Sequence, residues 1–172
     1  MLSLTYRPLT PADIPELAAV LRNSQVFQHI GGVPSEAEFA LGLQRAILGP
    51  PTERSSERWL NYVVRLTDTS QAIGRVEATL HHGIAEVAFL YGPEFWGKGY
   101  AYQGLTWLHE QFQEEVSAFW ATTTPANARS IKLLHRCGYV PAPTTNRPVL
   151  HSYDEGDLVF VRSTSPSAGP CE

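Results

Sequence analysis

Cysteine and long apolar runs are the scarcest features of this sequence. The 172 residues hold two cysteines, Cys137 and Cys171, far apart along the chain. Two such residues form no disulfide framework, which favours a reducing compartment, and we expect a cytoplasmic protein. No segment approaches the roughly eighteen apolar residues of a membrane-spanning helix, and residues 1–15 lack the basic leader and apolar stretch of a secretion signal. We therefore expect no membrane partner.

Basic residues are also few and dispersed. Lys and Arg total 13 against 17 Asp and Glu, the net charge is −4, and no basic run occurs. This balance argues against a nucleic-acid partner. The six histidines show no metal-ligand spacing, and the adjacent His81 and His82 would point to opposite sides of a strand. We therefore expect no metal.

What the sequence does contain is typical of one globular domain. Hydrophobic residues make up 43% of a chain that is long enough to bury a full core. We expect a single domain over residues 1–163. Residues 164–172, rich in Ser, Pro, Gly and Ala, are expected to form a flexible tail.

Hydrophobic periodicity predicts a mixed α/β domain. Asp13 and Glu16 have capping-box spacing and predict a first helix that begins near Asp13, while Ser35 and Glu38 predict a second that Gly49 ends. A third helix follows the glycines near residue 99 and a fourth follows Asn127. Strands are predicted at 2–7, 59–66, 73–81, 84–91, 117–123, a short segment from 139, and 158–162.

A glycine turn joins the apolar strand at 84–91 to the third helix. Gly97 and Gly99 lie where the first amide groups of that helix have no intrahelical partner, a geometry that binds anions. Glycines there can also serve only to relieve backbone strain. Gly92 and Gly97-Lys98 fit the start of a nucleotide-binding P-loop, but Gly99 stands where that motif needs Ser or Thr. A dinucleotide fingerprint fails because Tyr102 replaces its third glycine.

A second motif follows about thirty residues later. Trp96-Gly97-Lys98-Gly99-Tyr100-Ala101 is followed by Asn127-Ala128-Arg129-Ser130 and a helix that closes with Gly138-Tyr139. The pair resembles the GNAT acetyltransferase superfamily, and within it the Rim-type branch, named for ribosomal-protein N-terminal acetyltransferases. The resemblance covers nearly the whole chain. It implies a mixed, mostly antiparallel central sheet of about seven strands flanked by about four helices.

The resemblance also implies a site for acetyl-CoA as co-substrate. In such proteins the pyrophosphate lies on the amides of the glycine turn and the pantetheine arm runs beside the preceding strand. Asn127 corresponds to a residue that contacts this arm, although capping of the fourth helix explains it equally well. The implied cofactor residues are Phe89, Leu90, Tyr91, Trp96, Gly97, Lys98, Gly99, Tyr100, Ala101, Asn127 and Ser130.

The implied reaction is attack of an acceptor amine on the thioester carbonyl. Glu86 is the candidate base, since relatives often carry a carboxylate on this strand; a water chain or a simply solvated Glu86 remains the alternative. Ser130 matches the serine that protonates the leaving thiolate. Many relatives use a tyrosine seven positions after the asparagine, but Leu134 stands there, so positioning alone is the alternative. Gln103 is a further departure, because Rim-type chains commonly carry Glu there.

The expected function is therefore an N-acetyltransferase that moves acetyl from acetyl-CoA to a protein N-terminus or a small-molecule amine. A non-catalytic acyl-CoA-binding module is the alternative, because the tyrosine acid is missing. The expected partners are acetyl-CoA and an amine acceptor, and the protein itself is expected to be a monomer or homodimer. The acceptor would be selected by the first helices and the loops at 25–34 and 141–156, which carry no motif.

Overall fold

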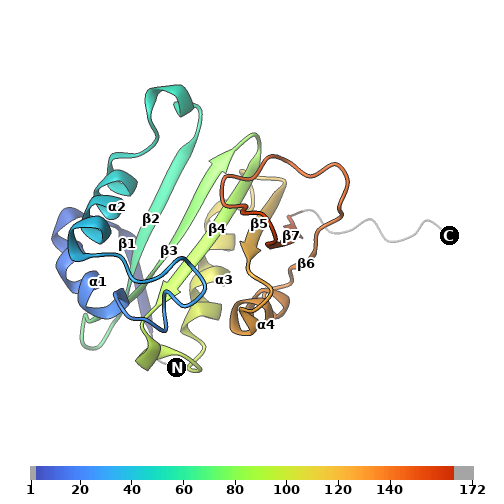
Figure 1. Cartoon of the computed structure of the whole chain (residues 1–172). Helices are drawn as coiled ribbons and strands as arrows, with labels where there is room; N and C mark the ends of the chain where they lie inside the picture. Colours follow the sequence, from blue (N-terminus) through green and yellow to red (C-terminus); the bar gives the residue numbers. More distant parts are fainter. Residues whose placement is uncertain (1–2, 165–172) are drawn as a thin grey trace.

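A computed structural model describes residues 3–164, which form one seven-stranded sheet with helices on both faces (Figure 1). Predicted and observed strands agree within a few residues. The elements are β1 (Leu4–Pro8), η1 (Pro11–Asp13), α1 (Ile14–Leu21), α2 (Glu36–Leu48), η2 (Thr52–Arg54), β2 (Arg58–Leu66), β3 (Ala72–His81), β4 (Ile84–Tyr91), η3 (Pro93–Phe95), α3 (Tyr100–Phe112), β5 (Ala118–Thr123), α4 (Ala128–Arg136), β6 (Val140–Pro141) and β7 (Leu158–Ser163).

The sheet has the order β1-β2-β3-β4-β5-β7-β6, and the β4–β5 pair is the parallel one. The mixed, mostly antiparallel seven-stranded sheet and its four α-helices confirm the predicted fold class. β4 and β5 pair through two positions only, Ala85 with Phe119 and Glu86 with Trp120. Beyond Glu86 the two strands separate, so a fork opens toward the C-terminal end of β4.

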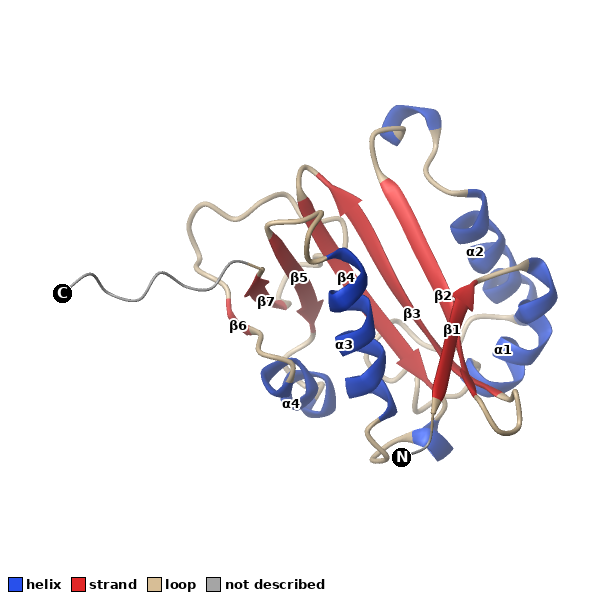
Figure 2. Cartoon of the chain, turned by 180° about the vertical axis from the view of Figure 1, so that it is seen from behind, coloured by secondary structure: helices blue, strands red, loops and turns tan. Residues whose placement is uncertain are grey.

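The helices divide between the two faces of the sheet. α1 and α2 cover β1 to β4 on one face, and α3 crosses β3 and β4 on the other, as the front and back views show (Figures 1 and 2). On the α3 face Leu105 and Leu108 are fully buried against the sheet, which confirms the apolar stripe predicted for this helix. On the opposite face Leu17 and Leu21 of α1 pack against α2.

The helix α2 begins as the sequence predicts. Ser35 Oγ accepts from the Glu38 amide at 3.2 Å, and the Glu38 carboxylate accepts from the Ser35 amide at 2.8 Å. This reciprocal pair satisfies two of the amide groups that a helix start leaves unpaired. The predicted capping box of α2 is confirmed.

The capping box predicted for Asp13 and Glu16 is wrong. The Asp13 side chain caps nothing in α1; it accepts from the Thr10 amide (2.9 Å) and hydroxyl (2.8 Å) and pairs with Arg7 and Arg65. The residue is 1% exposed. Burial alone would raise the pKa of Asp13, but these hydrogen bonds outweigh it and leave the pKa below its usual range. Asp13 therefore ties α1 to β1 and β2. The helix still begins beside it, at Ile14, as the sequence predicts.

The predicted termini fall partly outside the described residues. Leu2, the predicted first strand residue, and Cys171 lie outside them, as does the predicted tail from residue 165 onward. Thr164, placed in that tail by the sequence, donates from Oγ1 to the Val116 carbonyl at 2.8 Å. Within residues 3–164 no helix has the length and apolar character needed to cross a membrane.

Candidate active site

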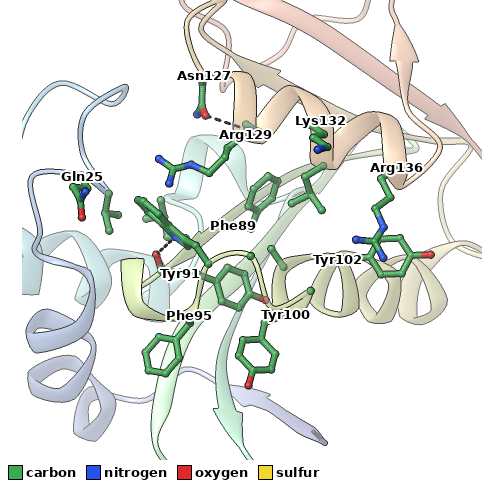
Figure 3. Close-up of a pocket in the computed structure, with 18 of the residues that line it drawn as sticks. Gln25, Phe89, Tyr91, Phe95, Tyr100, Tyr102, Asn127, Arg129, Lys132 and Arg136 are labelled. Atoms are coloured by element: carbon green, nitrogen blue, oxygen red, sulfur yellow. Dashed lines mark hydrogen bonds between the residues drawn. The ribbon is translucent and has the colours of Figure 1, made fainter. Parts of the chain in front are cut away.

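A groove of about 450 Å³ opens where β4 and β5 separate. One wall is the C-terminal half of β4 and the glycine turn, and the other is the first two turns of α4 (Figure 3). Gln25, Val26 and His29 of the α1–α2 loop close its third side. The fork in the sheet therefore leaves a channel that runs along β4 and ends at the N-terminus of α3.

The glycine turn has the backbone geometry of an anion site. Gly97 and Gly99 have φ values of +74° and +83°, which L-residues with side chains rarely adopt. Gly99 is the N-cap of α3 and offers no side-chain acceptor to the first amides of that helix. These amides and the positive end of the helix dipole face the groove. The turn can therefore hold a phosphate through backbone groups alone.

Cations and aromatic rings pair along the groove. The Arg129 guanidinium lies 3.5 Å from the centroid of the Trp96 ring, and Arg136 lies 4.4 Å from that of Tyr102. Trp96 also donates from Nε1 to the Tyr91 carbonyl at 2.8 Å, which fixes the turn to the end of β4. Together with Lys132, these arginines make the groove positively charged, although the protein as a whole has a net charge of −4. The groove therefore suits an anionic ligand.

The two predicted residues of α4 both line the groove. Asn127 Oδ1 accepts from the Ser130 amide at 3.2 Å, so its role as the N-cap of α4 is confirmed. Because this bond uses the amide oxygen, the Asn127 Nδ2 donors stay available to a ligand, and its contact with a pantetheine arm stays a prediction. Ser130 faces the same channel one turn into the helix.

The structure brings the predicted cofactor residues together with one exception. Ten of the eleven line the groove, from Phe89 on β4 to Ser130 on α4. Lys98 does not; its Nζ lies 5.8 Å from the centroid of the Phe95 ring. The turn therefore presents backbone rather than the lysine side chain to a ligand.

Glu86 lies outside this groove, at the apex of the fork. It is 5% exposed and its two oxygens accept four hydrogen bonds, from His81 Nε2 (2.6 Å), the His151 amide (2.8 Å), the Ser152 amide (2.9 Å) and the Ser152 hydroxyl (2.5 Å). Burial alone would raise its pKa, but these bonds outweigh that effect and lower the pKa below its usual range. Glu86 is therefore not a solvent-exposed side chain, and its role as the general base remains a prediction.

Comparison with known proteins identifies the family. A family model described as "Acetyltransferase (GNAT) domain" matches residues 3–140. The chain belongs to the GNAT acetyltransferase family. No curated protein matches it significantly.

Solved structures share the whole GNAT fold. A GNAT-family acetyltransferase from Bacillus anthracis superposes with a TM-score of 0.75 at 18% identity, covering 95% of this chain and 97% of its own. An acetyltransferase from Salmonella typhimurium that modifies the N-terminal serine of ribosomal protein L7/L12 gives 0.74 at 18%, covering 94% and 95%. An aminoglycoside acetyltransferase in complex with coenzyme A gives 0.72 at 20%, covering 94% and 95%. At sequence identities of 18–20%, these similarities show a shared fold and nothing further.

The two adjacent histidines of this GNAT domain do not point to opposite sides. His81 ends β3, and His82 lies in the following turn at φ +47°, which brings the two Nδ1 atoms to 3.1 Å. The strand-based expectation fails because His82 is outside the strand. His81, Glu86 and His151 form a cluster whose polar atoms lie within 4.8 Å of one another. The His81–Glu86 contact of 2.6 Å is a hydrogen bond that already joins two of the three, and we assign no metal ligand there.

A buried carboxylate beside this cluster predicts acid sensitivity. Burial alone would raise the pKa of Glu57, but bonds from Arg54 and Trp59 and the nearby charges of Arg54 and His151 lower it to about 2. A carboxylate with a lowered folded-state pKa stabilises the fold above its unfolded pKa, and this contribution is lost as pH falls. Between about pH 4.5 and pH 2 the domain should lose on the order of 2 kcal/mol from this group.

Glu57→Gln tests this expectation, because the amide has no charge to lose. Denaturant unfolding at pH 7 and pH 3 should show a smaller drop in the variant than in the wild type. Equal drops would mean that Glu57 does not carry the acid sensitivity.

The sequence did not lead us to several residues of the groove and of the fork apex. Arg129, Lys132 and Arg136 have helical spacings of three and four, so a basic stripe facing the ligand was visible in the sequence. Glu57, His151 and Ser152 had no such signal, because 29 positions separate Glu57 from Glu86 and 65 or more separate Glu86 from the other two.

Proposed function

We propose that this chain is an acetyl-CoA-dependent N-acetyltransferase that transfers the acetyl group to an acceptor amine by direct attack. One observation carries the proposal: the groove joins a positive-φ glycine turn, the N-terminus of α3 and the C-terminal half of β4 in one channel. The turn suits a pyrophosphate, and the channel along Phe89 to Tyr91 suits an extended arm. The fork apex at Glu86 lies farther along the same strand.

The acceptor class is proposed from the branch resemblance. The Rim-type motif favours a protein N-terminus, and a small-molecule amine is the second candidate. Gln25, Val26 and His29 of the 25–34 loop border the channel, and the amides of His151 and Ser152 of the 141–156 loop donate to Glu86 at the fork apex, outside the groove. These positions support the proposal that the two loops select the acceptor. The same groove also fits a module that binds acyl-CoA without transferring its acyl group.

Melting curves test the donor. A ligand that binds the folded state alone at about one hundred times its dissociation constant adds roughly 2.7 kcal/mol of stability. Acetyl-CoA should raise the melting temperature clearly, and ATP with magnesium should not. A shift with ATP and none with acetyl-CoA would contradict the proposal. Thiol release from acetyl-CoA in the presence of amines or peptides then separates an enzyme from a binding module.

Ser130→Ala tests the proposed acid. A thiol has an unperturbed pKa of about 8.5, so its departure needs little help, and we expect thiol release to slow by about 10-fold. Acetyl-CoA affinity should change little, because the Ser130 backbone amide still donates to Asn127. Ser163→Ala, at the exposed last residue of β7, is the matched control. An unchanged rate in Ser130→Ala would remove Ser130 from the mechanism and leave positioning as the explanation.

A further inference from the structure

Glu86 has no acceptor site left in the folded protein. A carboxylate offers about four lone-pair positions, and the side chain already accepts four hydrogen bonds. An incoming ammonium group would have to displace one of these donors before it could hydrogen-bond to Glu86. The carboxylate instead fastens residues 151 and 152 to the fork apex. This leaves the question of which nearby group takes the proton from the acceptor.

His151 is the nearby group with the required geometry. Its Nε2 lies 2.9 Å from Glu57 Oε1, and its side chain is 35% exposed. Glu57 is buried and held by Arg54 Nε at 2.7 Å and by the Trp59 indole at 2.9 Å. A fixed, ionised carboxylate at Nε2 favours the tautomer with its proton on that nitrogen. The polar contacts of the imidazole within residues 3–164 engage Nε2, which leaves the Nδ1 lone pair for a ligand.

The backbone holds His151 at the apex of the fork. Its amide and that of Ser152 donate to Glu86, and the Ser152 carbonyl accepts from the Thr122 hydroxyl of β5 at 2.7 Å. The loop is thus fastened to both arms of the fork, β4 and β5. Glu86 precedes the groove residue Phe89 by three positions, about 10 Å of extended strand. Ala88, which lies between them, is exposed.

An arm anchored at the glycine turn and running along β4 points its far end toward this apex. We propose that His151 is the general base of the transfer reaction, and that Glu57 and Glu86 position it. This inference rests on the proposed function. As the acceptor nitrogen forms its bond to the thioester carbon, Nδ1 takes a proton from that nitrogen. The carbon–sulfur bond then breaks, and the sulfur keeps the electron pair and leaves as the thiolate. The thiolate takes a proton from the Ser130 hydroxyl or from solvent, and His151 releases its proton to solvent, so each amine and acetyl-CoA give one N-acetyl amine and one thiol.

Charged and titratable groups face His151 from two strands, one short helix and the residue that precedes β2. Arg54 of η2 and Glu57, next to β2, lie on its Nε2 side. His81 of β3 lies with its ring centroid 4.6 Å from that of His151, and Glu86 of β4 accepts from its amide. His81 in turn bonds to Glu86 through Nε2. Among residues 3–164, Nδ1 of His151 forms no hydrogen bond with any of these side chains, and it is the position that we propose for the substrate.

His151→Ala tests the proposal and should remain folded, because the backbone amide that fastens Glu86 is retained. We expect kcat to fall by about 100-fold or more with the acetyl-CoA KM unchanged, and added imidazole to restore part of the rate. The acid limb of the pH–rate profile should disappear. Glu57→Gln should shift this limb and lower kcat by a smaller factor. His135→Gln, an exposed histidine of α4, is the matched control and should leave kcat unchanged.

Four outcomes would overturn the assignment. His151→Ala with wild-type kcat and an unchanged acid limb excludes His151, and loss of that limb in Glu86→Gln alone makes Glu86 the base. Loss of wild-type activity on chelation with restoration by zinc would make the cluster a metal site. A wild-type protein that binds acetyl-CoA and transfers nothing to any amine overturns the proposed function and the base with it, whereas an active His151→Ala variant overturns the base alone.

Discussion

Gly99→Val should reduce the affinity for acetyl-CoA by about 30-fold or more. A β-branched residue cannot hold φ near +83° without strain, so the turn should relax and turn its amides away from the phosphate. Each hydrogen bond from these amides to a charged phosphate is worth about 1.5–3 kcal/mol, so the loss of one or two accounts for the expected change. Isothermal titration with acetyl-CoA and with coenzyme A measures it.

Two control variants separate backbone strain from lysine chemistry. Gly49→Val introduces backbone strain at a similar φ of +86°, at the end of α2 and outside the groove, and should leave the affinity unchanged. Lys98→Ala should weaken binding by less than about 5-fold, since an exposed charge contributes up to roughly 1 kcal/mol. A Gly99→Val protein that binds as tightly as the wild type would show that the turn does not hold the phosphate.

Asp13→Ala should lower the free energy of unfolding by about 3 kcal/mol. Asp13 accepts hydrogen bonds from Thr10 and from two guanidinium groups, and each lost hydrogen bond of a charged group costs about 1.5–3 kcal/mol. Arg65 keeps its ion pair with Glu16 at 2.7 Å, so the loss stays at or below the cost of an uncompensated buried charge, roughly 3–5 kcal/mol. Asp13 is 1% exposed and pairs with Arg65, whose side chain is 15% exposed; its other partner, Arg7, is half exposed and can turn to solvent. For a domain of this size the loss corresponds to a melting temperature lower by about 6–12 °C.

Arg58→Ala is the comparison for that experiment. Arg58 pairs with Glu115 on the surface, where both side chains are about half exposed. Such pairs contribute about 0–1 kcal/mol, so the variant should unfold almost as the wild type does. Urea unfolding at pH 7 measures both proteins. If Asp13→Ala cost no more than Arg58→Ala, the Asp13 cluster would not be what ties α1 to the sheet.

The sequence could predict those parts of the site that are local along the chain. The glycine turn, the N-cap Asn127 and the apolar β4 are each set by residues within a few positions of one another, and so is the capping box of Ser35 and Glu38. The family resemblance, rather than these local patterns, implied that the first three form one acetyl-CoA site.

The sequence could not predict contacts between distant segments. The Asp13 carboxylate has the spacing of a capping box, but a buried guanidinium 52 positions away, Arg65, competes for it. The loop that carries His151 has no periodicity, and its position depends on bonds from its backbone to Glu86. His82 belongs to a turn and has a positive φ, so the prediction from side-chain alternation along β3 gave the wrong direction for its ring. In each case a tertiary contact or an unusual backbone angle overrode a local pattern.

The most direct test of the acetyltransferase assignment is the fate of the acetyl group itself. The protein should be incubated with acetyl-CoA carrying an isotope-labelled acetyl group and with a panel of peptides with free N-termini and small amines, and the products analysed by mass spectrometry. The account predicts a labelled N-acetyl product from at least one amine, formed in equal amount to free coenzyme A and lost together with acetyl-CoA binding in Gly99→Val. Tight acetyl-CoA binding with no labelled amine from any member of the panel would contradict it and leave a binding module.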